Sequence, residues 1–282
     1  MLTTELLLRR GLAGDGSELT LTLDPTFQGL PDTAHGGSVL AAFGLLAHGQ
    51  RVDSLHGRYL RRVPVGVPLR LRAARTADTL RCQLLDGSNA TLVEGQATDS
   101  AATGGVDGPG PFAAPVDPAP LPVSRTCFAC GTDNALGLRV RLGYDARTVG
   151  GTWTPPEVLV TGDGGLAPLA LTSLLDEAAF WLGALASGES GMTTDLAVTL
   201  HGAAPFGRTI RLAGARDRVR QRADDPRYWD TEVTACLDDG RLLARGHITF
   251  VAVRGAARKL AAWLRPLNPP GVVERVFPAY AG

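Results

Sequence analysis

The pattern of apolar and polar positions in the first hundred or so residues predicts one strand, then one buried helix, and then several strands. Residues 18–23 alternate strictly, which is typical of a strand with one buried face. Residues 37–47 are apolar on nearly every side, so we expect a helix enclosed by the rest of the domain. Further strands are predicted at residues 54–62, 67–76, 79–86 and 91–99, with a hairpin turn near Asp86 and Gly87.

The second half of the chain has the same order of elements. Its pattern predicts strands near 138–144 and 147–154, a buried helix near 167–186, and strands near 194–202, 208–218, 228–237 and 242–252. A strand, a buried helix and a meander of strands form an α+β arrangement. The sheet must curve around the helix to bury it, and the chain contains two such units.

A nearly constant offset relates the two halves. A shift of 141 residues places residues 69–75 on residues 210–216, and it also places Pro64-Val-Gly66 on Pro205-Phe-Gly207. Downstream the same order of residues continues. The second repeat contains an additional charged stretch, residues 218–230, which we interpret as a longer hairpin loop.

A Pro- and Gly-rich break divides the chain. Its composition favours an extended linker. The predicted organisation is a first repeat at residues 1–101, a linker at 102–123, a second repeat at 124–253 and a tail at 254–282. Helical spacing of Leu260, Trp263 and Leu264 predicts a short tail helix docked on the core, with a membrane or partner helix as the alternative.

Composition narrows the function classes. The 282 residues have a formal net charge of zero and a pI near 7, which argues against the broad basic surface of a nucleic-acid-binding protein. No apolar run reaches the roughly 18 residues that a membrane span needs, and the N-terminus lacks a signal-peptide pattern. The four cysteines fit reduced thiols better than a disulfide framework, so we expect a cytoplasmic protein.

Three segments resemble a known superfamily. Residues 34–42 contain His35-Gly36-Gly37, which resembles the motif that opens the central helix of PaaI-like hotdog-fold acyl-CoA thioesterases. Residues 173–178 resemble the segment that carries the catalytic acid in that helix, and residues 127–138 resemble a common opening of hotdog repeats. The resemblance implies a double hotdog fold, with two repeats that each wrap a curved antiparallel sheet around a central helix.

The implied chemistry explains why glycines open the helix. Negative charge develops on the thioester oxygen during attack, and free N–H groups at a helix N-terminus stabilise it. Gly36 and Gly37 would let the backbone approach the substrate because they lack side chains. A carboxylate then attacks the carbonyl or activates water, and no cofactor is required. In the related thioesterases the helix end and the acid come from different subunits.

The two repeats differ at the position of the acid. In the superfamily the acid lies nine residues beyond the motif His, which is Gly44 in the first repeat and Asp176 in the second. Counting back from Asp176 leads to Ala167, which Pro168 follows. Proline has no N–H to donate to an oxyanion. The first repeat therefore keeps the donor end, and the second repeat keeps the acid.

The superfamily's hydroxyl residue follows the same division. It corresponds to Thr193 in the second repeat, whereas the 141-residue shift leads to the apolar Val52 in the first. We predict a degenerate second cleft and one composite catalytic site, formed by His35, Gly36, Gly37, Asp176 and Thr193.

Other polar residues leave alternatives open. Glu177 could contact the substrate or replace Asp176 as the acid. Arg58 and Arg61 could bind phosphates of CoA, although arginines at alternating strand positions more often form a solvated face. Cys127 and Cys130 form a C-x-x-C pair, but a structural zinc needs about four ligands and no second pair lies close in the sequence. We interpret this pair as a turn with buried thiols and predict no metal.

Three functions remain in competition. Hydrolysis of an acyl thioester, with CoA or an acyl-carrier protein as the carrier, is the leading hypothesis. A thioester dehydratase or hydratase is the second, and a non-catalytic acyl-CoA or lipid-binding protein is the third, because a fold does not decide function. A monomer and a homodimer are both compatible with a chain that already contains two repeats.

Overall fold

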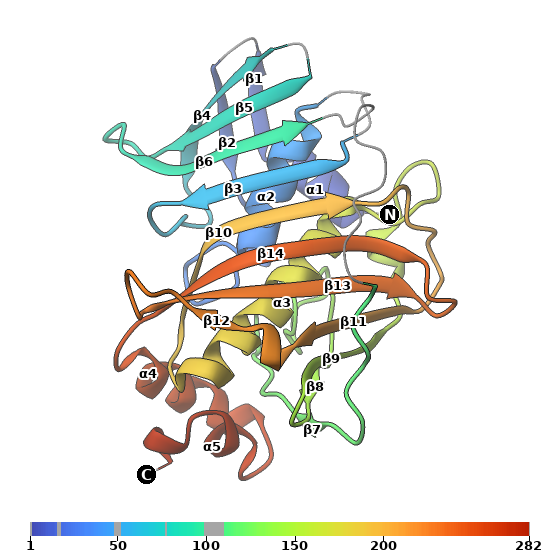
Figure 1. Ribbon diagram of the computed structural model, residues 1–282. Coiled ribbons are helices and arrows are strands. Elements are labelled where there is room, and N and C mark those ends of the chain that lie inside the picture. Colours follow the sequence, from blue (N-terminus) through green and yellow to red (C-terminus); the bar gives the residue numbers. More distant parts are fainter. Residues whose placement is uncertain (1, 16–17, 48–51, 77, 99–109, 282) are drawn as a thin grey trace.

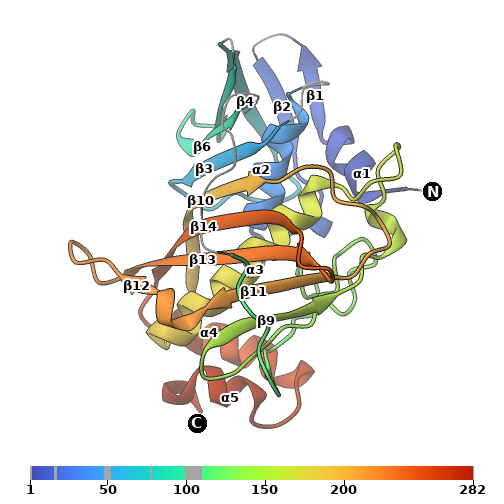
Figure 2. The same cartoon turned by 45° about the vertical axis from the view of Figure 1, so that its right-hand side comes forward.

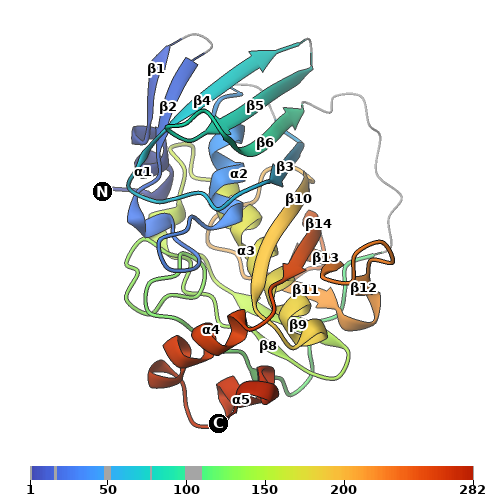
Figure 3. The same ribbon diagram turned by 90° about the vertical axis from the view of Figure 1, so that its left-hand side faces the viewer.

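The strands form one antiparallel sheet that curves around two central helices, α2 (Gly36–Leu45) and α3 (Pro168–Ser187), as Figures 1 and 3 show. This computed structural model describes residues 2–15, 18–47, 52–76, 78–98 and 110–281. The first repeat contains α1 (Thr4–Arg10), β1 (Leu12–Asp15), β2 (Glu18–Thr22), β3 (Ser54–Tyr59), β4 (Pro68–Arg75), β5 (Thr79–Leu85) and β6 (Thr91–Thr98).

The second repeat has the same arrangement of strands around its central helix. It contains β7 (Ala119–Pro120), β8 (Gly143–Tyr144), β9 (Thr148–Trp153), β10 (Gly191–Leu200), β11 (Ile210–Ala215), β12 (Arg220–Gln221), β13 (Tyr228–Leu237) and β14 (Leu242–Ala252). Short 3-10 turns, η1 (Pro25–Phe27) and η2 (Glu157–Leu159), precede α2 and α3. The tail forms α4 (Ala256–Leu264) and α5 (Val272–Val276), and the other 3-10 turns are η3 (Arg216–Arg218), η4 (Arg265–Leu267) and η5 (Pro278–Tyr280).

The two repeats meet at one pair of central strands. The sheet order is β1-β2-β4-β5-β6-β3-β10-β14-β13-β11-β9-β8-β7, so β3 and β10 join the halves (Figure 2). His56 of β3 lies opposite Ala197 of β10, and these residues are related by the same 141-residue shift found in the sequence. The pseudo-twofold axis that relates the repeats therefore passes through this pair.

Glycines in equivalent strands let the central helices lie against the sheet. A Cβ atom on Gly95 of β6 would lie 2.3 Å from the ring of Phe43 in α2. A Cβ atom on Gly246 of β14 would lie 2.8 Å from Ile248 and 3.3 Å from Leu175 in α3. The absence of side chains at both positions lets the helices bury their apolar faces inside the curve of the sheet.

The α+β arrangement predicted from the sequence is confirmed, with differences at its edges. The helix α1 and the strand β1 were not predicted, and only residues 143–144 of the strand expected at 138–144 pair as a strand. Residues 102–109 of the expected linker lie outside the described residues. Its described part lies on the second repeat, where β7 pairs with β8 and the Phe112 N–H donates to Thr234 Oγ1 at 3.0 Å.

The helix α3 is long and apolar enough to cross a bilayer by length and composition. It has 20 residues, and 83% of its most apolar window is buried inside the protein. Its apolar residues therefore face the sheet and α2, as expected for the core helix of a globular domain.

Gly37 lies where α2 crosses α3. A Cβ atom there would lie 2.5 Å from Cα and 2.6 Å from N of Ser173, so it would collide with the backbone of α3. We expect Gly37→Ala to lower the free energy of unfolding by about 2–3 kcal/mol, as measured by chemical denaturation.

Gly44 provides a matched control in the same helix. A Cβ atom there would make ordinary contact with Leu55, at 3.4 and 3.6 Å. Because alanine favours helices, Gly44→Ala should be neutral or stabilising by up to about 1 kcal/mol. Equal losses of stability in both variants would contradict this account of the helix crossing.

Candidate active site

The turn before α2 fixes the position of His35. The His35 N–H donates to the Phe27 carbonyl at 2.8 Å, and the Ala34 N–H donates to the Val63 carbonyl at 2.8 Å. His35 is the N-cap residue of α2, and its side chain is buried, with 5% exposed. The backbone therefore holds the imidazole beneath the N-terminus of its own helix.

The turn before α3 has the same design with different chemistry. The bridges Val160–Leu166 and Gly165–Pro205 in the second repeat correspond to Gln28–Ala34 and Thr33–Pro64 in the first. This correspondence places Ala167 at the position of His35. Pro168, the first residue of α3, then replaces Gly36. The start of α3 therefore lacks both the imidazole and one N–H that the start of α2 has.

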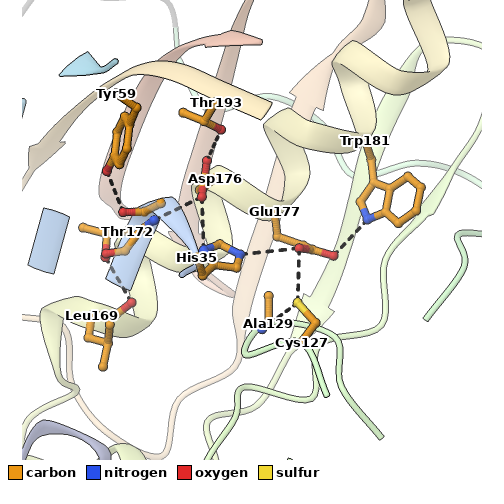
Figure 4. A network of polar contacts seen from close by, with 12 residues as sticks. His35, Tyr59, Cys127, Ala129, Leu169, Thr172, Asp176, Glu177, Trp181 and Thr193 are labelled. Atoms are coloured by element: carbon orange, nitrogen blue, oxygen red, sulfur yellow. Dashed lines mark hydrogen bonds and ion pairs between the residues drawn. The ribbon is translucent and has the colours of Figure 1, made fainter. Parts of the chain in front are cut away.

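Asp176 of α3 lies against the N-terminus of α2 (Figure 4). Its Oδ2 atom accepts the Gly37 N–H at 3.0 Å, and its Oδ1 atom accepts the hydroxyl of Thr193 at 2.5 Å. A Cβ atom on Gly36 would lie 2.8 Å from the same Oδ2 atom. The glycines therefore make room for a carboxylate that comes from the other repeat.

Tyr59 polarises the peptide group that binds Asp176. Its hydroxyl donates to the Gly36 carbonyl at 2.6 Å, and the N–H of that same peptide belongs to Gly37. Hydrogen bonds in such a chain strengthen one another. The Gly37 N–H is consequently engaged, whereas the Gly36 N–H has no hydrogen-bond partner among the described residues.

His35 lies between two buried carboxylates. Its Nδ1 atom is 3.0 Å from Oδ2 of Asp176, off the line of its N–H bond, and its Nε2 atom is 3.5 Å from Oε2 of Glu177. Burial alone would lower the pKa of His35, but the two carboxylates outweigh burial and raise the pKa from 6.5 to about 10. The imidazole is therefore a cation at neutral pH.

Asp176 stays ionised in spite of its burial. Removal from water favours the neutral acid, but the nearby His35 charge and the hydrogen bonds from Thr193 and Gly37 together hold the pKa of Asp176 below its usual value. The carboxylate is therefore charged at neutral pH.

Glu177 links the imidazole to a second group of residues. Trp181, one helical turn further along α3, donates its indole N–H to Oε1 of Glu177 at 2.9 Å. The Oε2 atom lies 3.9 Å from Sγ of Cys127. That sulfur belongs to the loop of residues 124–131, which we call the Cys127 loop, and it accepts the Ala129 N–H at 3.3 Å.

The residues around His35 form the floor of a pocket. Its volume is about 840 Å³ when the open space at its mouth is included. The polar floor contains His35, Asp176 and Glu177. The walls are largely apolar and come from α3, from β10 and from the tail helix α4: Phe180, Trp181, Met192, Leu260, Trp263 and Leu264. The tail helix therefore closes one side of the pocket and is docked on the core, as predicted from its spacing.

The predicted residues mostly converge on this pocket. His35, Gly36, Asp176, Glu177 and Thr193 line it, and the Gly37 N–H binds Asp176 behind them. The two arginines that were predicted as candidate phosphate ligands, Arg58 and Arg61, lie in different places. Arg61 lies at the mouth next to Arg62, whereas Arg58 lies on the outer face of the sheet in a different hollow, with His56 and Arg72.

Three residues of the site were not predicted as such. Trp181 lies four residues after Glu177, and this helical spacing is a signal that could have identified it. Tyr59 follows Arg58 in β3, so strand alternation directs its side chain to the opposite face. Cys127 was interpreted only as a buried thiol, because nothing in the sequence near it shows that its loop packs beside His35.

No family model matches the sequence, and no curated protein matches it. Solved structures do match. A candidate thioesterase from Novosphingobium aromaticivorans has a TM-score of 0.62 at 19% identity and covers 86% of this chain and 98% of its own. A hot dog fold protein of unknown function from Alicyclobacillus acidocaldarius has a TM-score of 0.61 at 13% identity and covers 89% and 99%.

An acyl-CoA thioesterase II from Mycobacterium marinum has a TM-score of 0.60 at 15% identity and covers 86% of this chain and 95% of its own. At such identities the likeness establishes the fold. The protein is a double hotdog protein, as the sequence predicted, and its matches extend over nearly the whole length of these structures.

Proposed function

We propose that the protein hydrolyses acyl thioesters, with acyl-CoA as the leading substrate class. The observation that supports this most strongly is the position of Asp176. This buried carboxylate of the second repeat lies against the N-terminus of α2 from the first repeat, at the floor of a pocket with apolar walls. That one of the structural matches is described as an acyl-CoA thioesterase II agrees with the proposal.

Each site residue has a role in the proposed reaction. Asp176 takes a proton from a water molecule as that water attacks the carbonyl carbon. Thr193 fixes the carboxylate through its hydrogen bond to Oδ1. The Gly36 N–H, with the dipole of α2 behind it, stabilises the tetrahedral oxyanion. The intermediate then expels the carrier thiolate, which receives the proton from Asp176 and leaves as a thiol beside the carboxylic acid.

The pocket walls suit the two ends of such a substrate. The apolar wall formed by Phe180, Trp263 and Leu264 fits an acyl group. Arg61 and Arg62 at the mouth could pair with phosphates of CoA or of the arm of an acyl-carrier protein. The choice of carrier, the monomeric or dimeric state and the cytoplasmic location remain predictions from the sequence.

A dehydratase or hydratase is less consistent with the site. Such a reaction would use a histidine to remove a proton from the acyl chain. His35 has a carboxylate near each ring nitrogen, and these carboxylates raise its pKa to about 10, which opposes the role of a base at neutral pH. A non-catalytic binding protein would bind acyl-CoA without turnover, and the experiments below distinguish it.

Asp176→Asn should reduce kcat for acyl-CoA hydrolysis by at least about 100-fold, because the base that activates water is lost. A panel of acyl-CoA chain lengths, followed by release of free thiol, measures this effect. Circular dichroism and thermal unfolding establish that each variant is folded.

Asp195→Asn is the matched control for Asp176. Asp195 lies on β10 two residues after Thr193, but it pairs with His56 at 3.0 Å away from the pocket. Its replacement should leave kcat unchanged. Wild-type turnover in folded Asp176→Asn would exclude the proposed base, and no turnover of any acyl-CoA by wild type would favour the binding protein.

Arg61→Ala should raise KM for acyl-CoA by about tenfold, the loss expected for one hydrogen bond to a charged group. The KM for a thioester that lacks phosphates, such as an N-acetylcysteamine thioester, should not change. Arg58→Ala, from the outer face, should alter neither value. If Arg58→Ala weakened acyl-CoA binding and Arg61→Ala did not, the proposed direction of substrate entry would be wrong.

A further inference from the structure

Three potential metal ligands meet on the floor of the pocket, on the side of His35 that faces away from Asp176. They are Nε2 of His35, Oε2 of Glu177 and Sγ of Cys127, and all three atoms lie within 4.8 Å of one another (Figure 4). All three side chains are buried, and all three line the pocket. Their residues come from the first repeat, from α3 and from the Cys127 loop.

We propose that His35, Cys127 and Glu177 form a binding site for a zinc ion. This inference does not depend on the proposed hydrolysis. The mixture of imidazole, thiolate and carboxylate is a ligand set that zinc accepts, whereas magnesium and calcium prefer oxygen ligands alone. Three protein ligands leave a fourth position on a tetrahedral zinc ion, which can hold water.

The distances are close to those that zinc requires. With usual bond lengths and tetrahedral angles, a nitrogen and an oxygen ligand lie about 3.4 Å apart, and a sulfur and an oxygen ligand about 3.6 Å apart. The structure places His35 Nε2 and Glu177 Oε2 at 3.5 Å, and Cys127 Sγ and Glu177 Oε2 at 3.9 Å. The third pair, His35 Nε2 and Cys127 Sγ, lies within 4.8 Å, so the sulfur and the imidazole would move closer together around the ion.

Each ligand already has the neighbour that a metal ligand needs. Metal-binding imidazoles usually place their other nitrogen against a carboxylate, and Asp176 lies 3.0 Å from Nδ1 of His35. The Trp181 indole binds Oε1 of Glu177 and leaves Oε2 for the ion. The Ala129 N–H donates to Sγ of Cys127, which stabilises a thiolate.

Metal analysis of the purified full-length protein tests the site. After incubation with equimolar zinc and gel filtration, we expect about one zinc ion per chain by mass spectrometry. Cobalt(II) in place of zinc should give a thiolate-to-cobalt charge-transfer band in the near ultraviolet. Wild-type protein that retains no zinc, or that binds cobalt without this band, would overturn the proposal.

Ligand variants provide the second arm. Cys127→Ser and Glu177→Gln should each weaken zinc binding by at least about 100-fold, since even the loss of a neighbour that orients a ligand costs 10- to 100-fold. Cys82→Ser, which alters a buried thiol of β5 away from the pocket, should bind zinc as wild type does. Equal zinc affinity in Cys127→Ser and Cys82→Ser would contradict the site. Zinc binding is measured without a substrate. The zinc site can therefore be confirmed even if the protein does not hydrolyse acyl thioesters.

Discussion

The close crossing of α2 and α3 is the constraint on which the rest of the structure depends. The two helices approach until the space for a side chain on Gly37 is taken by the backbone of Ser173, and the space on Gly36 is taken by Asp176. The same approach brings Oδ2 of Asp176 within 3.0 Å of the Gly37 N–H. Packing and chemistry therefore have one cause, because a larger residue at either glycine would separate the helices and the site together.

The buried charges impose the second constraint. One cation and two carboxylates lie out of water around His35, and removal of one member of such a group leaves an uncompensated charge that costs about 3–5 kcal/mol. Neutral hydrogen-bond donors stabilise the carboxylates in addition to the imidazolium. Thr193 and the Gly37 N–H donate to Asp176, and Trp181 donates to Glu177. These donors also fix the direction of each carboxylate, so the requirement for stability produces an ordered site.

The sequence predicted what local pattern and internal repetition determine. Periodicity located both central helices and the meander strands, and the resemblance to the hotdog thioesterases divided the site into a donor half with His35 and an acid half with Asp176. The sequence did not reveal which residues from distant parts of the chain lie close together in the fold. The Cys127 pair was judged on local spacing alone, and its neighbours His35 and Glu177 come from distant parts of the chain. The edge strand β1 and helix α1 were missed because they are short and their stability depends on packing.

The asymmetry between the starts of α2 and α3 extends to the segments that pack beside them. The Cys127 loop forms the start of the second repeat and packs beside η1 of the first, where the Phe128 N–H donates to the Gln28 carbonyl at 2.7 Å. The helix α1 forms the start of the first repeat and contacts η2 of the second, and its Leu8 side chain is buried. One segment brings a thiol and backbone donors, and the other brings an apolar helix.

The tail adds to this difference, since a single chain end can cover only one cleft. It covers the side where His35 and Asp176 meet, with Leu260, Trp263 and Leu264 in the pocket wall. In a symmetric dimer of single repeats, every change is made in both clefts at once. Fusion removes that coupling, so Pro168 and Gly44 could accumulate in one cleft while the other kept its polar floor and acquired its own wall.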